Sequence, residues 1–202
     1  DAYLIGNYTT TLMGTQAQGL ILPRDLDFHK DVERQNELWV INENNLDGRN
    51  HGGSTVTYYD AGQETQWTEY RRDSYSGHFM HTASAIAMSE NGTFGNTLDC
   101  QDANDSDGYF TGPVLCDSDT SVYARANQNG PLLGSHLDMI HQTPYGEGIA
   151  SAGENVYWVF DGFHNAIVKY DFVQPHIVGG DDHSDGKVWR HSEVVVQRSP
   201  GL

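Results

Sequence analysis

Ten histidines occur among the 202 residues, and several of them sit in pairs beside apolar residues. His78 and His81 belong to the segment GHFMHT, His136 and His141 belong to GSHLDMIH, and His164 lies in the predicted turn of VYWVFDGFHN. Imidazole is the commonest neutral ligand of transition metals in proteins, and two or three rings at one point suffice to bind copper or zinc. The sequence therefore predicts a transition-metal site built from these five histidines.

The neighbours of these histidines favour copper over zinc. Met80 and Met139 lie beside the histidine pairs, and thioether sulfur is a ligand that favours Cu(I). Zinc is the alternative metal. The histidines could also be ordinary loop residues that form hydrogen bonds, with no metal involved.

Three acidic segments that end in glycine predict calcium binding, because Ca²⁺ takes several oxygen ligands from alternating loop positions. Two of these segments supply the candidate ligands, which are Asp102, Asp105, Asp107, Asp181 and Asp185. The third segment runs from Glu43 to Gly48. A glutamate at the twelfth position is missing from all three, which excludes an EF-hand. The alternative is that these aspartates accept hydrogen bonds from their own backbone in turns.

Several features favour a secreted or cell-surface protein. The chain opens with DAYLIGNYTT, without an initiator methionine or an apolar signal segment, which predicts a processed mature start. Cys100 and Cys116 could close a polar loop as a disulfide that contributes about 3 kcal/mol. Asn7, Asn91 and Asn104 are candidate glycosylation sites in N-x-S/T sequences.

The charge balance excludes some partners. Eleven basic residues against 28 acidic ones give a net charge of −17, which repels nucleic-acid phosphates and anionic membranes. The sequence also has no apolar run near the roughly 20 residues that a membrane-spanning helix needs. We therefore expect metal ions, a cell-surface partner or a second copy of the chain as partners, and neither nucleic acid nor a membrane span.

Short apolar runs rich in Val, Ile, Tyr and Trp, separated by Gly, Asn and Asp, predict an all-β protein. These runs repeat in order along the chain. PRDLDF, ELWVIN and STVTYYD form one unit, and GEGIAS, VYWVFD and AIVKYD form another. A weaker copy between them comprises SAIAM, GPVLCD and TSVYA, and a fourth copy opens with GKVWRH.

Repeated units of short strands and tight turns are typical of β-propeller blades. We predict a single propeller domain over residues 1–202, with units at residues 20–79, 80–143, 144–185 and an incomplete 186–202. Three blades and part of a fourth fall short of the usual four to eight. Either residues 1–20 complete the last blade or the chain is a fragment of a larger propeller.

The segment VYWVFDGFHNAIVKYD resembles the NHL blade, in which a strand ending in Asp precedes a turn with Asn and a strand ending in Tyr-Asp or Phe-Asp. The histidine-bearing segments resemble the methanotroph surface copper-binding proteins of the MopE-like group. That resemblance implies a copper site with two histidines and an oxidised tryptophan two positions before one of them. Only Trp189 stands in this relation, to His191, whereas Ser76 precedes His78, so the tryptophan ligand is in doubt.

No nucleophile elbow, P-loop, dinucleotide fingerprint or H-E-x-x-H motif occurs, so binding is favoured over catalysis. One enzymatic alternative is a lyase or hydrolase similar to the peptide-amidating lyase, an NHL-like propeller with histidine-bound zinc and structural calcium. In that case Tyr145 or Glu147 would serve as acid or base, and Arg125 would anchor an anionic substrate. The remaining alternative is an interaction scaffold that needs no metal.

Overall fold

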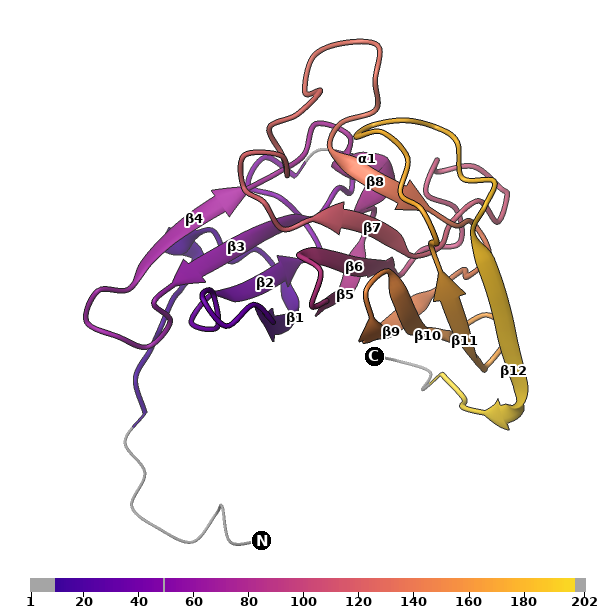
Figure 1. Cartoon of the computed structure of the whole chain (residues 1–202), viewed down its shortest axis with the longest axis horizontal. Coiled ribbons are helices and arrows are strands. Elements are labelled where there is room, and N and C mark those ends of the chain that lie inside the picture. Colours follow the sequence, from indigo (N-terminus) through magenta and orange to yellow (C-terminus); the bar gives the residue numbers. More distant parts are fainter. Residues whose placement is uncertain (1–9, 49, 199–202) are drawn as a thin grey trace, which may run out of the picture.

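The computed structural model describes residues 10–48 and 50–198, and the regular secondary structure of these residues is almost entirely β-strand, joined by turns and loops (Figure 1). The predicted all-β class is therefore confirmed. The strands form three antiparallel sheets of four strands each, and each sheet follows the order of the chain. The only α-helix among the described residues is four residues long, and no helix there has the length and hydropathy that a membrane crossing requires.

Each sheet uses one continuous stretch of chain. The first sheet consists of β1 (Pro23–Phe28), β2 (Leu38–Asn42), β3 (Ser54–Tyr59) and β4 (Trp67–Arg71). The second consists of β5 (Ala83–Met88), β6 (Thr93–Leu98), β7 (Val114–Asp117) and β8 (His136–Met139). The third consists of β9 (Gly146–Gly153), β10 (Val156–Asp161), β11 (Ala166–Asp171) and β12 (Lys187–Val195). The short helices η2 (Gln16–Gln18) and α1 (Ser76–Phe79) precede the first and the second sheet.

Two apolar layers separate the three sheets. Trp39 and Ile41 of β2 pack with Phe94 of the second sheet, and on its other face Leu115 packs with Tyr157 of the third sheet. Because the middle sheet is covered on both faces, β5 and β6 are buried along their whole length. Burial in β11 alternates from residue to residue, as expected for a strand with one covered face.

The propeller prediction is wrong. A propeller closes a ring of at least four sheets. The described residues instead form three open sheets that stack in layers, as in a β-sandwich. The segment that opens with Gly186, predicted to begin a fourth unit, supplies β12, which pairs with β11 and completes the third sheet. The outer face of the first sheet is covered by Met13 and Leu20 rather than by another sheet.

The predicted disulfide is also wrong, because Cys100 and Cys116 are both free and buried. The register of the second sheet explains this. Cys116 lies opposite Phe94, whereas Cys100 follows Leu98 at the far end of β6. The step from Phe94 to Leu98 alone spans about 13 Å at the rise of a β-strand, and a disulfide needs Cα atoms within about 7 Å. The secreted location stays a prediction, without the disulfide to support it.

Aspartate side chains join the first sheet to the second. The Ile86 amide donates to Asp25 Oδ2 at 3.0 Å, and the Met88 amide donates to Asp27 Oδ2 at 2.9 Å. Both aspartates lie on β1, and both amides lie on β5, so carboxylates replace the backbone partner that a neighbouring strand would supply. Ser84 Oγ likewise donates to the Gly146 carbonyl and links the second sheet to the third.

Removing these carboxylates should destabilise the stack of sheets. We expect Asp25→Ala and Asp27→Ala each to lower the free energy of unfolding by about 1.5–3 kcal/mol, because each leaves a β5 amide without its charged acceptor. Denaturant unfolding followed by tryptophan fluorescence measures the change. Glu64→Ala, at an exposed position in the β3–β4 turn, is the control. An equal and small effect for all three variants would show that the junction does not depend on these bonds.

Candidate metal centre

His136 stands at the first position of β8, and the residues before it fix its place. The buried carboxylate of Asp73 accepts hydrogen bonds from the Ser135 amide at 2.9 Å and from Ser135 Oγ at 2.6 Å. The same oxygen accepts a bond from Gln128 Nε2 at 2.7 Å. This network anchors the turn from which β8 starts, so the His136 ring enters the interior from a rigid position.

The connection between β11 and β12 folds over the start of β8, and Figure 1 shows it (orange to yellow) beside β8 and α1. The Gly179 amide donates to the His136 carbonyl at 2.8 Å, and the Leu133 amide donates to the Gly179 carbonyl at 2.9 Å. Asn127 Nδ2 also donates to the Val178 carbonyl at 2.7 Å. These bonds bring His176 and His183, which both belong to this connection, next to His136.

His136, His176 and His183 each place one ligand nitrogen within 4.8 Å of the others. The Nδ1 atom of each ring has its own partner. His136 Nδ1 lies 2.9 Å from the Leu133 carbonyl and His176 Nδ1 lies 2.6 Å from the Ile177 carbonyl. His183 Nδ1 lies 2.8 Å from Oδ1 of Asp138. The Met139 amide also points at His183 Nδ1, at 3.0 Å, but the ionised Asp138 carboxylate beside it can only accept, which places the His183 proton on Nδ1. With Nδ1–H donating to these acceptors, the lone pair of each ring is on Nε2. Such outer partners are what fix the tautomer of metal-binding histidines.

The interior lowers the basicity of the rings. Burial, reinforced by the neighbouring histidines, lowers the pKa of His136 to about 3, although the Leu133 carbonyl opposes the shift. Burial also lowers the pKa of His141 to about 4. The Nε2 atoms of His136, His141 and His176 are buried and have no hydrogen-bond partner among the described residues. Neutral rings with unused lone pairs are the form of histidine that binds metal ions.

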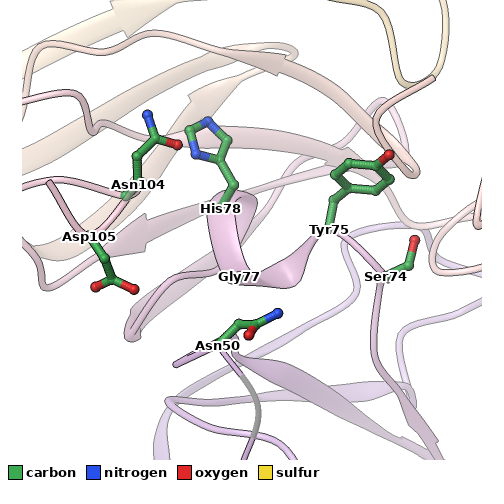
Figure 2. Close-up of a pocket in the computed structure, with 8 residues that line it drawn as sticks. Asn50, Ser74, Tyr75, Gly77, His78, Asn104 and Asp105 are labelled. Carbon is green, nitrogen blue, oxygen red and sulfur yellow. The ribbon is translucent and has the colours of Figure 1, made fainter. Parts of the chain in front are cut away.

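His78 and His141 adjoin this triad. The His141 ring lies 5.6 Å from the His183 ring and 5.8 Å from the His78 ring, measured between centroids. His78 is on α1 and lines an open cavity of about 400 Å³ together with Tyr75 and Asn104 (Figure 2). Burial lowers the pKa of His78, whereas hydrogen bonds that the ring donates to the Ala103 backbone and to the Asn104 side chain act in the opposite direction.

The other two predicted histidines lie elsewhere. His81 Nδ1 lies 2.9 Å from the Gly77 carbonyl, and its Nε2 lies 3.3 Å from Asp105 Oδ1. His164 Nδ1 lies 2.7 Å from Oδ2 of the fully buried Asp161, in the turn between β10 and β11. The structure therefore brings together three of the five predicted histidines and adds His176 and His183.

The two methionines do not support a Cu(I) site. Met80 Sδ accepts a hydrogen bond from the Tyr123 hydroxyl at 3.3 Å, deep in the layer between the first two sheets. Met139 is fully buried in that same layer. Their sulfur atoms serve the apolar core, which is the usual role of methionine in proteins.

The predicted calcium ligands do not converge. Among the described residues, no group of three acidic side chains lies close enough to share one ion. Asp102 Oδ1 accepts a bond from the Asn104 amide, and Asp102 Oδ2 accepts one from Ser106 Oγ. Burial would raise the pKa of Asp102, but these bonds outweigh it and lower the pKa. The remaining candidates, Asp105, Asp107, Asp181 and Asp185, are exposed. The acidic loops are thus organised as Asx turns, and calcium binding stays a prediction.

Of the glycosylation candidates, Asn91 and Asn104 are exposed in turns, and Asn7 lies outside the described residues.

The residues predicted for a lyase-like site contact other side chains, away from the histidine triad. Glu147 pairs with Arg198, and Arg125 pairs with Glu69. The Tyr145 ring lies under Arg198, whose guanidinium is 4.8 Å from the ring centroid.

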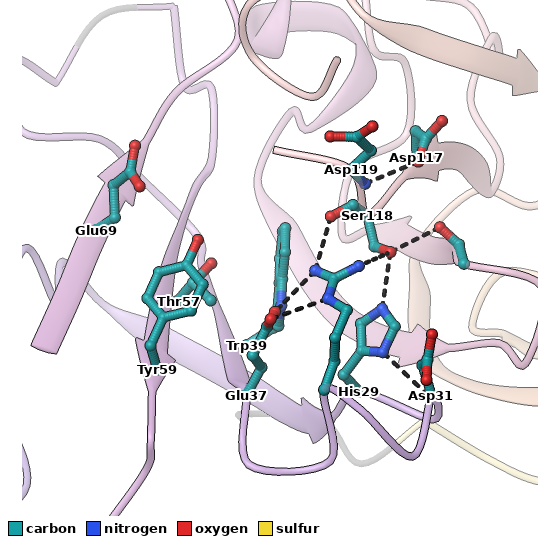
Figure 3. Close-up of polar contacts among 12 residues, drawn as sticks. His29, Asp31, Glu37, Trp39, Thr57, Tyr59, Glu69, Asp117, Ser118 and Asp119 are labelled. Carbon is teal, nitrogen blue, oxygen red and sulfur yellow. Dashed lines mark hydrogen bonds and ion pairs between the residues drawn. The ribbon is translucent and has the colours of Figure 1, made fainter. Parts of the chain in front are cut away.

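A serine–histidine pair outside this centre is structural (Figure 3). His29 Nε2 lies 2.8 Å from Ser118 Oγ, and the Asp31 amide donates to His29 Nδ1. Because Nδ1 accepts, the proton is on Nε2 and His29 donates to the serine. Ser118 Oγ in turn donates to the Gly92 carbonyl and accepts a bond from Arg34. This polarity is the reverse of a catalytic pair, in which histidine takes the serine proton.

Two of the three triad histidines were missed by the sequence analysis. His183 lies inside the acidic segment Asp181 to Gly186. The aspartates of this segment predict calcium binding, so its histidine was not considered as a transition-metal ligand. His176 follows Pro175 in an isolated segment with no repeat partner. The sequence signal that could have indicated both residues is that His176 and His183 lie seven residues apart in a single connection.

Comparison of the sequence with protein-family models and with curated proteins finds no match.

Moving the β11–β12 connection should open the centre. Gly179 has φ +76°, and a Cβ at this position would lie 2.5 Å from the Gly134 carbonyl oxygen. We expect Gly179→Ala to lower the affinity for Zn²⁺ at least tenfold, measured by competition with a chromophoric chelator. Gly62→Ala is the matched control, because Gly62 has φ +79° but open space around it. Equal affinities of the two variants would contradict the role of this contact.

Acid should destabilise the metal-free protein through the buried rings. His136 and His141 have pKa values of about 3 and 4 in the folded chain, below the ordinary 6.5. Below pH 6.5 the unfolded chain therefore takes up protons that the folded chain does not. As the pH is lowered, the free energy of unfolding decreases by up to about 1.4 kcal/mol per pH unit for each ring. Denaturant unfolding in a chelator between pH 4.5 and 7.5 tests this. His136→Phe should have the shallower slope, and an unchanged slope would show that His136 is protonated normally.

Proposed function

We propose that this protein binds a transition-metal ion, zinc or copper, through Nε2 of His136, His176 and His183. The observation that carries the proposal is the approach of three imidazole nitrogens to within 4.8 Å of one another, with the second nitrogen of each ring held by another acceptor.

The spacing of the rings suits one ion. The ring centroids of the triad are 4.8, 5.0 and 5.8 Å apart. An ion 2.0–2.1 Å from each nitrogen in tetrahedral geometry holds imidazole centroids roughly 5 Å apart and the nitrogens roughly 3.4 Å apart. The nitrogens, which lie up to 4.8 Å apart, therefore need to approach one another by up to about 1.4 Å, and His176 and His183 can supply this movement because they are half-buried on a connection.

The donor set favours zinc or copper over calcium. Three neutral imidazoles, with a carboxylate behind one of them, suit Zn²⁺ and Cu²⁺, whereas Ca²⁺ requires oxygen ligands. Asp138 is fully buried and its Oδ1 accepts from both His183 Nδ1 and the Met139 amide. Its negative charge offsets part of the charge of a bound cation. Three protein ligands leave the fourth position of a tetrahedral ion open to water or to another ligand.

Loss of one triad ligand should abolish tight binding. The chain is stripped with a chelator, titrated with Zn²⁺ and, separately, with Cu²⁺, and followed by calorimetry. We expect His176→Ala and His183→Ala each to weaken binding more than 100-fold, and Asp138→Asn to weaken it about 10–100-fold, as loss of an outer partner does. His191→Ala is the matched control, since this half-buried ring lies outside the cluster, with Nδ1 2.8 Å from Glu193 and its centroid 5.2 Å from that of Trp158. Unchanged affinity in both triad variants would overturn the proposal.

A further inference from the structure

Two more imidazole nitrogens lie unused beside the triad. His78 Nδ1 and His141 Nε2 are buried, and neither has a hydrogen-bond partner among the described residues. A buried nitrogen without a partner costs about 1–3 kcal/mol. Two such atoms on neighbouring rings therefore point to a ligand that satisfies both, as the equivalent atoms of the triad do.

The two rings have the spacing of a metal site. Their centroids lie 5.8 Å apart, with an angle of 42° between the ring planes. An ion bound 2.0–2.1 Å from both nitrogens would hold the centroids roughly 5–6 Å apart. The distance between the centroids equals that between His136 and His183 within the triad.

The surroundings restrict movement and supply negative charge. Phe110 stacks on His141 at 3.6 Å between centroids, and Phe79 meets the His78 ring edge to face at 4.7 Å. These rings hold the two imidazoles in place and keep part of the site apolar. The carboxylate of Asp102 acts on both rings and favours positive charge at each of them.

The five histidines do not form a single group. Within the described chain, the group of three or more ligand residues whose atoms lie within 4.8 Å of one another consists of His136, His176 and His183, without His78 and His141. His141 is the neighbour between the two groups, since its ring lies 5.6 Å from His183 and 5.8 Å from His78. We therefore propose that His78 Nδ1 and His141 Nε2 bind a second zinc or copper ion, adjacent to the ion of the triad. This inference rests on the proposed function.

A route to this second position exists. His78 lines both the 400 Å³ cavity of Figure 2 and a smaller cavity of about 320 Å³ that also touches Phe110 and Leu133. His141 lines a third cavity of about 460 Å³, together with Tyr109 and Phe163. Water or an exchangeable ligand can therefore reach the pair and complete the coordination of an ion held by two protein nitrogens.

Metal counting tests the second position. The stripped chain is loaded with excess Zn²⁺ or Cu²⁺, desalted, and analysed by plasma mass spectrometry. We expect two ions per parent chain and one ion per His78→Phe/His141→Phe chain, in which the phenyl rings fill the space of the imidazoles. The His176→Ala/His183→Ala chain should retain only the ion between His78 and His141. Circular dichroism and thermal unfolding check that each variant is folded, and His191→Ala should bind as the parent does.

The remaining outcomes separate this inference from the proposed function. One ion in the parent that persists in His78→Phe/His141→Phe supports the triad and overturns the second position. One ion that is lost in both double variants also overturns it, because all five rings would then serve a single ion. No ion in the parent chain would overturn both proposals.

Discussion

Two backbone hydrogen bonds hold the histidine cluster together. The Gly179 amide donates to the His136 carbonyl, and the Leu133 amide donates to the Gly179 carbonyl. They fix the β11–β12 connection of the third sheet on the first residue of β8 in the second sheet. Without them, His176 and His183 would belong to a loop unrelated to His136. The left-handed conformation and close packing of Gly179 make this contact depend on a residue without a side chain.

The layered fold determines the chemistry of the cluster. The second sheet is covered on both faces, so a ring at the start of its outer strand is withdrawn from water although it lies at the edge of a sheet. Burial keeps His136 and His141 neutral well below the ordinary pKa of histidine. It also leaves imidazole nitrogens without partners, which costs free energy in the metal-free protein. A bound cation would recover that free energy, so metal binding and stability are linked.

The positions of many strands were predictable, because local residue composition indicates where a strand forms. Val156 to Asp161 and Ala166 to Asp171 became β10 and β11 where the apolar runs predict them. The arrangement of the sheets was not predictable from the repeat. Similar repeat units indicate similar sheets, but whether the sheets close into a ring depends on what covers the faces of the outermost sheets. Residues 120–124 show a further limit, because this apolar run forms a tight turn through the Asp119 carbonyl rather than a strand.

The position of the histidine cluster was only partly predictable. Residue type indicated a histidine cluster that includes His78, His136 and His141, and metal binding by that cluster stays a proposal. His164 and His81 fit the same pattern, yet each already has a carboxylate partner. His183 was missed because the approach of a loop to a distant strand depends on tertiary hydrogen bonds that have no local sequence signal.

Diffraction from crystals grown with Zn²⁺ would test the assignment of the centre most directly, with data collected on both sides of the zinc absorption edge. We predict an anomalous peak about 2.0–2.1 Å from Nε2 of each of His136, His176 and His183. An anomalous peak away from these three rings, or no peak at all, would contradict the assignment.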